Sequence, residues 1–286
     1  MARYRTNAQI GRELSISVRT VESHVASLLR KFGVGDRRAL ADLVRPTVDE
    51  SLAGSASVVG VPASRDSFVG REPVGAQIVA YLSEARLVSL LGPGGIGKSR
   101  LAVVVVESIG HRFSDGGAYV DLVGVGRGFV AQTVAAAFDV GEVPLRSLAD
   151  AVLGRIGDAK VLLVFDNCDH LIDEASELIG RLLAGCPRLT VLVTSRERLG
   201  VSGERTVQVP PLPLESEAVR LFTDRARSVD PEFGADPGTL AELCGRLDGV
   251  PLAIELAAAR VGSLGVEGLR EALDDRLRVL AGGRGT

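Results

Sequence analysis

The spacing of hydrophobic residues changes along the chain and separates stretches with different expected structure. Between residues 87 and 209, short apolar runs alternate with amphipathic segments, and polar or glycine residues close each run. We expect strands at residues 87–91, 118–122, 161–165, 190–194 and 206–209. Apolar strands that alternate with helices are typical of a parallel sheet covered on both faces, so the pattern predicts an α/β fold.

The pattern becomes helical throughout after the sequence Pro210-Pro-Leu-Pro213. The expected helices cover residues 215–228, 239–247, 252–261 and 266–280. We therefore predict an α/β domain over residues 67–213 and a small helical subdomain over residues 214–286.

The first 45 residues form a separate pattern, with short helices expected at residues 7–14, 18–32 and 37–44. Ser17 can cap the second of these helices, whose apolar side chains recur at helical spacing along one stripe. Residues 46–66 are rich in Pro, Ser, Ala and Gly and lack aromatic residues, which predicts a linker.

Charge is distributed unevenly between these parts. Residues 1–45 hold nine Arg and Lys and four acidic residues, a net charge of +5, whereas the whole chain carries −3. A basic head on an acidic body indicates a polyanionic partner for the head. Lysine is rare: Lys31, Lys98 and Lys160 stand against thirty arginines. A lysine retained at Lys98 therefore indicates a need for a compact ammonium group there.

Composition argues against membrane and secreted classes. Hydrophobic residues make up 46% of the chain, enough for a core, yet no apolar run approaches the ~20 residues that cross a bilayer. The N-terminus has no apolar region typical of a signal peptide. Three scattered cysteines fit neither a disulfide framework nor a zinc site. We expect a cytoplasmic protein without a membrane partner.

The sequence Gly92-Pro-Gly94-Gly95-Ile-Gly97-Lys98-Ser99 follows a predicted strand and opens a predicted helix. This is the phosphate-loop motif in the context that the motif requires. Its glycines let backbone N–H groups converge on phosphate oxygens at a helix N-terminus. Lys98 is expected to bridge the β- and γ-phosphates and Ser99 to ligate Mg²⁺, so we predict ATP and Mg²⁺ as ligands.

Three further residues are candidates for nucleotide chemistry. Asp166 ends an apolar strand, where an acid can hold Mg²⁺ through water; a turn or cap role is the alternative. Asp169 is the nearest acid that could orient a water molecule, or it is an N-cap for the helix after it. Arg196 closes the next strand, either as a surface residue or as a cation that senses the γ-phosphate.

Six motifs occur in an order that resembles the NB-ARC-type signal-transduction ATPases with numerous domains (STAND). They are Phe68-Val-Gly-Arg-Glu72, the phosphate loop with Arg100-Leu-Ala, Leu163-Val-Phe-Asp-Asn-Cys-Asp-His170, Thr194-Ser-Arg-Glu-Arg-Leu-Gly200, Pro210-Pro-Leu-Pro213 and Gly249-Val-Pro-Leu-Ala-Ile-Glu-Leu256. The resemblance places Val69 and Arg71 near adenine and ribose, makes Arg196 the sensor arginine, and puts Pro251 against the base. Arg100, directly after the phosphate loop, is a further candidate for nucleotide binding. It implies a switch between ADP- and ATP-bound states with slow hydrolysis as a timer. Asn167 stands where many relatives have a second acid.

The head resembles the LuxR-type helix-turn-helix through Thr6-Asn-Ala-Gln-Ile-Gly-Arg-Glu-Leu14, Ser17-Val-Arg-Thr-Val-Glu-Ser-His-Val25 and Leu29-Arg-Lys-Phe-Gly-Val34. In that family the second of these helices enters the major groove. The resemblance implies that Glu22, Ser23 and Ala26 face base edges, while Thr20 and Lys31 contact phosphates. Arg19 is a further candidate for DNA binding. The helix that usually precedes the equivalent of Thr6 is not in this sequence, so we expect a truncated domain. An amphipathic packing helix is the alternative.

These observations predict a bacterial, nucleotide-switched transcriptional regulator, or a fragment of one, that binds DNA through its head and self-associates in response to nucleotide. Two alternatives remain at this point. One is a signalling or interaction module that binds ADP and ATP without binding DNA. The other is a metabolic phosphotransferase, for which the sequence offers no acceptor motif.

Overall fold

The computed structural model describes residues 17–18, 57–63, 66–141 and 146–282. The chain divides into two units, Met1–Gly54 and Ser55–Thr286, and nearly all described residues belong to the second. The residues predicted to contact DNA lie outside the described ranges; they are Arg19, Thr20, Glu22, Ser23 and Lys31. The first and third helices expected in the head lie outside them too.

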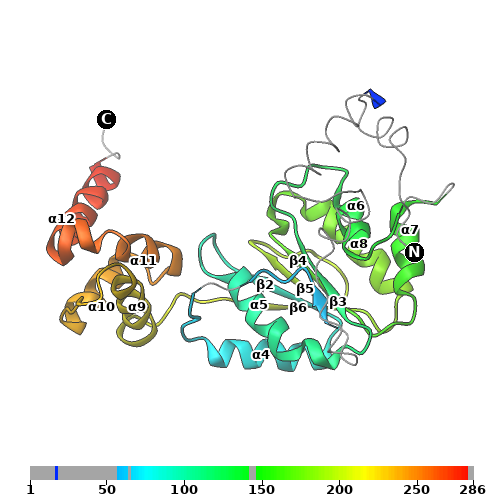
Figure 1. Ribbon diagram of the computed structural model, residues 1–286, viewed down its shortest axis with the longest axis horizontal. Coiled ribbons are helices and arrows are strands. Elements are labelled where there is room, and N and C mark those ends of the chain that lie inside the picture. Colours follow the sequence, from blue (N-terminus) through cyan, green and yellow to red (C-terminus); the bar gives the residue numbers. More distant parts are fainter. Residues whose placement is uncertain (1–16, 19–56, 64–65, 142–145, 283–286) are drawn as a thin grey trace, which may run out of the picture. The chain divides into compact units, whose positions relative to one another are not determined.

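A parallel six-stranded sheet forms the centre of the described α/β part, as the apolar pattern predicted (Figure 1). Its strands are β1 (Val58–Val59), β2 (Leu87–Leu91), β3 (Gly117–Asp121), β4 (Leu162–Asp166), β5 (Thr190–Ser195) and β6 (Glu204–Gln208). They lie in the order β1-β3-β4-β5-β2-β6. The two-residue strand β1 falls inside the segment expected to be a linker, where it pairs with β3.

Helices cover both faces of this sheet (Figure 1). On one face lie α4 (Glu72–Glu84) and α5 (Lys98–Ile109), and on the other lie α6 (Val130–Ala137), α7 (Leu148–Ile156) and α8 (Ile172–Gly185). Alternate residues of β4 enter the two cores: Leu162 and Val164 pack toward α5, whereas Leu163 and Phe165 pack toward α8. Burial on both faces explains why the strands are continuously apolar.

The C-terminal part is helical, as expected. It contains a π-helical turn at Leu214–Ala218, then α9 (Val219–Val229), α10 (Pro237–Arg246), α11 (Pro251–Ala258) and α12 (Val261–Gly282). Gly265 interrupts α12 with φ 67°, a value that glycine adopts at low cost. These helices have their own core, in which the rings of Phe222 and Phe233 lie 6.1 Å apart.

All three cysteines are buried and free, so the chain contains no disulfide. Among the helices in the described ranges, none combines the length and apolar character that crossing a bilayer requires.

Candidate functional site

The candidate site lies at the carboxyl edge of the sheet, where β2, β4 and β5 end. Strand β5 pairs with both β2 and β4, so the loop after β2 and the acid that ends β4 lie on either side of it. The loop after β2 runs directly into α5, whose N-cap is Gly97 with φ 91°. Crevices at the carboxyl ends of parallel strands are the usual ligand sites of such sheets.

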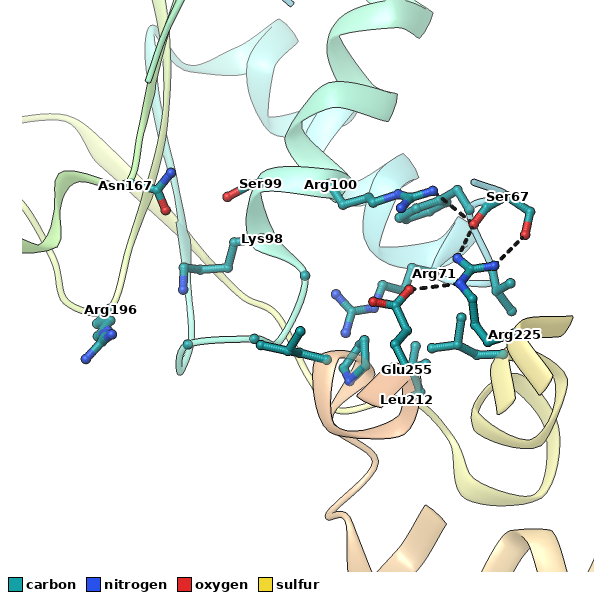
Figure 2. Close-up of a pocket in the computed structure, with 18 of the residues that line it drawn as sticks. Ser67, Arg71, Lys98, Ser99, Arg100, Asn167, Arg196, Leu212, Arg225 and Glu255 are labelled. Carbon is teal, nitrogen blue, oxygen red and sulfur yellow. Dashed lines mark hydrogen bonds and ion pairs between the residues drawn. The ribbon is translucent and has the colours of Figure 1, made fainter. Parts of the chain in front are cut away.

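A cavity of about 340 Å³ opens at this edge (Figure 2). Five cationic side chains line it against two carboxylates, although the chain as a whole is acidic. The lining residues are Ser67, Phe68, Val69, Arg71, Gly94, Gly95, Gly97, Lys98, Ser99, Arg100, Asn167, Asp169, Arg196, Leu212, Leu221, Arg225, Pro251, Leu252 and Glu255. An excess of fixed positive charge in a crevice attracts anions.

Lys98 occupies the first position of α5 and is only 9% exposed. Its ammonium group donates hydrogen bonds to two carbonyls of its own loop, Gly92 O at 2.8 Å and Pro93 O at 3.1 Å. Burial lowers the pKa of Lys98, while the carboxylates of Asp169 and Asp166 act to raise it. The lysine is therefore held inside the loop at the N-terminus of a helix, where the helix dipole contributes further partial positive charge.

Asp166 ends β4 and points its carboxylate at the start of α5. Ser99 donates a hydrogen bond from Oγ to Asp166 Oδ1 at 2.8 Å, and the Thr194 hydroxyl donates to the same oxygen. The other oxygen, Oδ2, accepts from Tyr119 Oη at 2.8 Å and from Asn167 Nδ2 at 3.1 Å. Both carboxylate oxygens are thus fixed by side chains from neighbouring elements.

Asp169 and Arg196 form an ion pair across the ends of β4 and β5. The backbone N–H of Arg196 donates to Asp169 Oδ1 at 2.6 Å, and its Nε lies 3.1 Å from Oδ2. Arg196 Nη2 reaches the loop, because a Cβ added at Gly94 would lie 3.4 Å from it. The Arg196 side chain is two-thirds exposed and lines the cavity, so an anion that enters the cavity can contact it.

Arg71 reaches the cavity from the segment before α4, with φ 68° and an exposure of only 5%. Its Nη2 donates to Pro210 O at 3.0 Å. Its Nη1 is buried and has no hydrogen-bond partner among the described residues. This nitrogen lies beside the loop, since a Cβ added at Gly97 would lie 3.2 Å from it. Burial lowers the pKa of Arg71, and Glu217 partly offsets the effect.

The opposite wall of the cavity is apolar and comes largely from the helical part. Leu212, Leu221, Pro251 and Leu252 line it. The N–H of Leu252 donates to Gly95 O at 3.2 Å, which ties the start of α11 to the loop. This contact explains a glycine at position 95, where an added Cβ would lie 3.0 Å from the Leu252 side chain.

A polar cluster closes the rim between the two parts (Figure 2). Arg225 of α9 contacts Glu255 of α11 at 3.1 Å and donates to the Ser67 carbonyl at 2.9 Å. The same carbonyl accepts from Arg100 of α5 at 3.0 Å. The Ser67 carbonyl thus accepts hydrogen bonds from one arginine of the α/β part and one of the helical part.

Comparisons with known proteins agree with this architecture. The luxR family of bacterial regulatory proteins matches residues 1–44. The uncharacterized protein Rv0894 of Mycobacterium tuberculosis is 46% identical over 223 residues, which cover 77% of this chain and 57% of that protein. The regulatory protein AfsR of Streptomyces griseus is 31% identical over 265 residues, which cover 82% of this chain and 26% of AfsR. The chain thus spans little more than half of the first relative and about a quarter of the second.

The solved structure of a Walker-type ATPase from Pyrococcus abyssi superimposes with a TM-score of 0.55 at 16% identity. The match covers 81% of this chain and 77% of the ATPase chain. The fold is that of the P-loop ATPases. In this P-loop fold, the loop at residues 92–99 and the acid at the end of β4 occupy the same edge of the sheet.

Most residues predicted for the site surround the cavity of this P-loop fold. Of the ten predicted to bind nucleotide, nine line it: Val69, Arg71, Gly94, Gly95, Gly97, Lys98, Ser99, Arg100 and Pro251. Gly92 does not line the cavity, but its carbonyl accepts a hydrogen bond from Lys98. Asp166 lies behind the lining and accepts a hydrogen bond from the lining residue Ser99. Asp169 does not cap α8, whose N-cap is Leu171; its carboxylate binds Arg196.

Sequence reasoning did not assign Leu212, Leu221, Leu252, Arg225 or Glu255 to the site. Three of them fall inside or beside motifs that were noted, since Leu212 lies in the proline-rich segment and Leu252 and Glu255 lie in the motif that begins at Gly249. Leu221 and Arg225 belong to α9, where no local pattern distinguishes them from other helix residues.

Proposed function

We propose that this chain binds ATP and ADP with Mg²⁺ in the cavity at the phosphate loop, and that the bound nucleotide switches a DNA-binding transcriptional regulator. The buried Nη1 of Arg71 is the observation that carries the nucleotide proposal. An unpaired donor on a charged, buried group costs free energy. A polar ligand that accepts a hydrogen bond from Arg71 Nη1 beside the phosphate loop would remove that cost.

The polar side of the cavity fits a polyphosphate. Backbone N–H groups at the start of α5 combine with the ammonium of Lys98 and the guanidinium of Arg196. Phosphate oxygens can replace the loop carbonyls that Lys98 binds at present, because an anion is a stronger partner for an ammonium than a carbonyl is. Arg196 reaches the loop while it is paired with Asp169, so a phosphate in the cavity would compete with Asp169 for the guanidinium and couple this ion pair to the nucleotide state.

The apolar side fits a nucleobase. Val69 and Pro251 line the cavity together with Phe68 and three leucines, two of which come from the helical part. Bases stack favourably on apolar side chains, and Arg71 supplies the polar contact that would orient the base or ribose. Because α11 touches the loop through Leu252 and Gly95, a nucleotide in this cavity would contact both parts of the unit at once.

Mg²⁺ fits the same edge as a shared ligand of protein and phosphate. The described residues contain no cluster of three or more acidic, His or Cys side chains that could hold a metal alone. Ser99 provides a hydroxyl and Asp166 provides one carboxylate. Mg²⁺ commonly takes one or two carboxylates from the protein when phosphates supply further ligands. The ion would neutralise phosphate charge, and Asp169 could orient water for slow hydrolysis that acts as a timer.

Regulation of DNA binding is supported by the head. Residues 1–44 match the luxR family of bacterial regulatory proteins, and residues 1–45 carry a net charge of +5. We infer that ATP favours self-association of a STAND-type arrangement and brings two heads to one DNA site. When two heads are held together, binding of one head to DNA raises the effective concentration of the other at its site. The pair therefore binds DNA more tightly than either head alone.

Calorimetry with ATP and ADP, in the presence and absence of Mg²⁺, tests the nucleotide proposal directly. Light scattering with ADP, with a non-hydrolysable ATP analogue and without nucleotide tests self-association. We expect a larger mass with the analogue than with ADP; a single mass in all three conditions contradicts the switch.

Band shifts with genomic DNA fragments at low and moderate salt test the head. The double variant Arg19→Ala/Lys31→Ala is expected to weaken the complex and reduce its salt dependence. With fewer phosphate contacts, formation of the complex releases fewer counterions. Lys160→Ala in the α/β unit serves as a control in which a positive charge is lost outside the head. Nucleotide binding without any salt-sensitive DNA complex favours the alternative, an interaction module that does not bind DNA.

A further inference from the structure

The carboxylate of Asp166 is enclosed more completely than metal binding alone requires. Four described side chains donate to it, and they divide evenly between its two oxygens. Oδ1 faces the loop through Ser99, whereas Oδ2 faces away and receives Tyr119 and Asn167. Asp166 is only 4% exposed, so the carboxylate depends on these side chains for its hydrogen bonds.

Tyr119 reaches Asp166 because of the register between two strands. In the pairing of β3 with β4, Tyr119 lies opposite Val164, and Asp121 lies opposite Asp166. Tyr119 and Asp166 are therefore diagonal neighbours on one face of the sheet, a separation that an aromatic side chain spans. The ring of Tyr119 packs in the core beneath α5, which leaves its hydroxyl a single direction in which to point.

This contact has a consequence for the orientation of the carboxylate. A carboxylate that ends a strand can rotate about its last bond and turn the plane of its two oxygens away from a ligand. With Oδ2 bound by Tyr119 and Asn167, rotation would break two hydrogen bonds in a buried site. One carboxylate oxygen therefore stays directed at Ser99, so that the carboxylate and the hydroxyl would together hold one metal ion, directly or through water.

We propose that Tyr119 is a positioning residue for the metal: its hydroxyl fixes Oδ2 of Asp166 so that Oδ1 and Ser99 present a preformed site for Mg²⁺ beside the phosphate loop. The proposal rests on the proposed function, since the described residues offer no metal cluster without a nucleotide. Asn167 supports the same oxygen from the exposed side. Partners of this kind, one step removed from a metal, commonly change metal affinity by about 10–100-fold.

The variant Tyr119→Phe removes the hydroxyl and keeps the ring in the core. Mn²⁺, which is visible by electron paramagnetic resonance, is titrated into the full chain saturated with ADP. We expect Tyr119→Phe to weaken Mn²⁺ binding about tenfold, in the range known for partners of metal ligands. ADP affinity measured with EDTA is expected to be unchanged, because no part of the tyrosine lines the cavity.

Tyr81→Phe is the matched control, because among the described residues the Tyr81 hydroxyl has one hydrogen bond, accepted at 3.4 Å from Gln77 on the surface of α4. A double-mutant cycle with Asp166→Asn separates positioning from packing. If Tyr119 acts through Asp166, adding Tyr119→Phe to Asp166→Asn causes no further loss of Mn²⁺ affinity. Should thermal denaturation show that Tyr119→Phe does not fold, Asn167→Gly removes the other donor to Oδ2 at a position with φ 60°, where glycine is well tolerated.

The outcomes distinguish the two proposals. Wild-type chain that binds ADP and Mn²⁺, with equal Mn²⁺ affinity in Tyr119→Phe, overturns the positioning role and leaves nucleotide binding intact. A variant that loses ADP affinity in EDTA as much as Mn²⁺ affinity has a general structural defect, which also overturns it. A wild-type chain that binds no nucleotide overturns the proposed function and this inference together.

Discussion

Replacing Lys98 by alanine is the most direct test of the candidate site. The side chain is 9% exposed and donates two hydrogen bonds, to Gly92 O and Pro93 O. Its loss leaves both loop carbonyls without this donor and removes the ammonium from the start of α5. Hydrogen bonds from a charged group contribute about 1.5–3 kcal/mol each, but removing a buried charge offsets part of that. We expect the free energy of unfolding to fall by about 1–3 kcal/mol without loss of the fold.

The larger effect concerns the ligand. A ligand present at a hundred times its Kd stabilises the folded state by about 2.7 kcal/mol. For a unit of this size, each kcal/mol corresponds to roughly 2–4 °C in Tm, so saturating MgATP should raise the wild-type Tm by about 5–11 °C. In Lys98→Ala this rise should disappear, because the group that offsets the phosphate charge is gone.

Differential scanning calorimetry with and without MgATP measures both effects on the same sample. Lys160→Ala is the control: this lysine lies 6.0 Å from the ring of Phe113 and does not line the cavity. It should keep the full rise in Tm. If Lys98→Ala shows the wild-type rise, the phosphate loop is not where ATP binds and the assignment of the site is wrong.

Three further predictions concern the loop, the apolar wall and the metal. Gly97→Ala introduces a side chain at φ 91° and 3.2 Å from a buried guanidinium, so it should lower stability by about 1–2 kcal/mol and abolish ATP binding by calorimetry. Gly124→Ala, with φ 76° and no atom within 4 Å of the added Cβ, should lose stability through its backbone conformation alone and still bind ATP. Leu252→Asp should weaken ATP at least tenfold because it places a carboxylate in the cavity, whereas Leu264→Asp, similarly exposed and outside it, should not; equal affinities would exclude this wall from the site. Removal of Mg²⁺ by EDTA should weaken ATP binding to the wild type much more than to Asp166→Asn, and an equal response would show that Asp166 has no part in holding the metal.

The regular elements of this protein could be predicted because their signals are local. Residues 87–91 were expected as a strand and form β2 with the same bounds. The phosphate loop was found from eight consecutive residues, since the spacing of its glycines and lysine is itself the requirement for binding phosphate. The β-branched run Leu101–Val106 lies within α5, because a helix follows directly from the phosphate loop.

The tertiary structure decided what depends on contacts between distant segments. The order of the strands brings Tyr119 of β3 to Asp166 of β4, and no periodicity within either strand encodes that neighbour. Asp169 had two local interpretations, yet its carboxylate binds Arg196, 27 positions away. A local pattern records which side of a strand or helix is buried, whereas the partner of each polar group depends on strand order and helix packing.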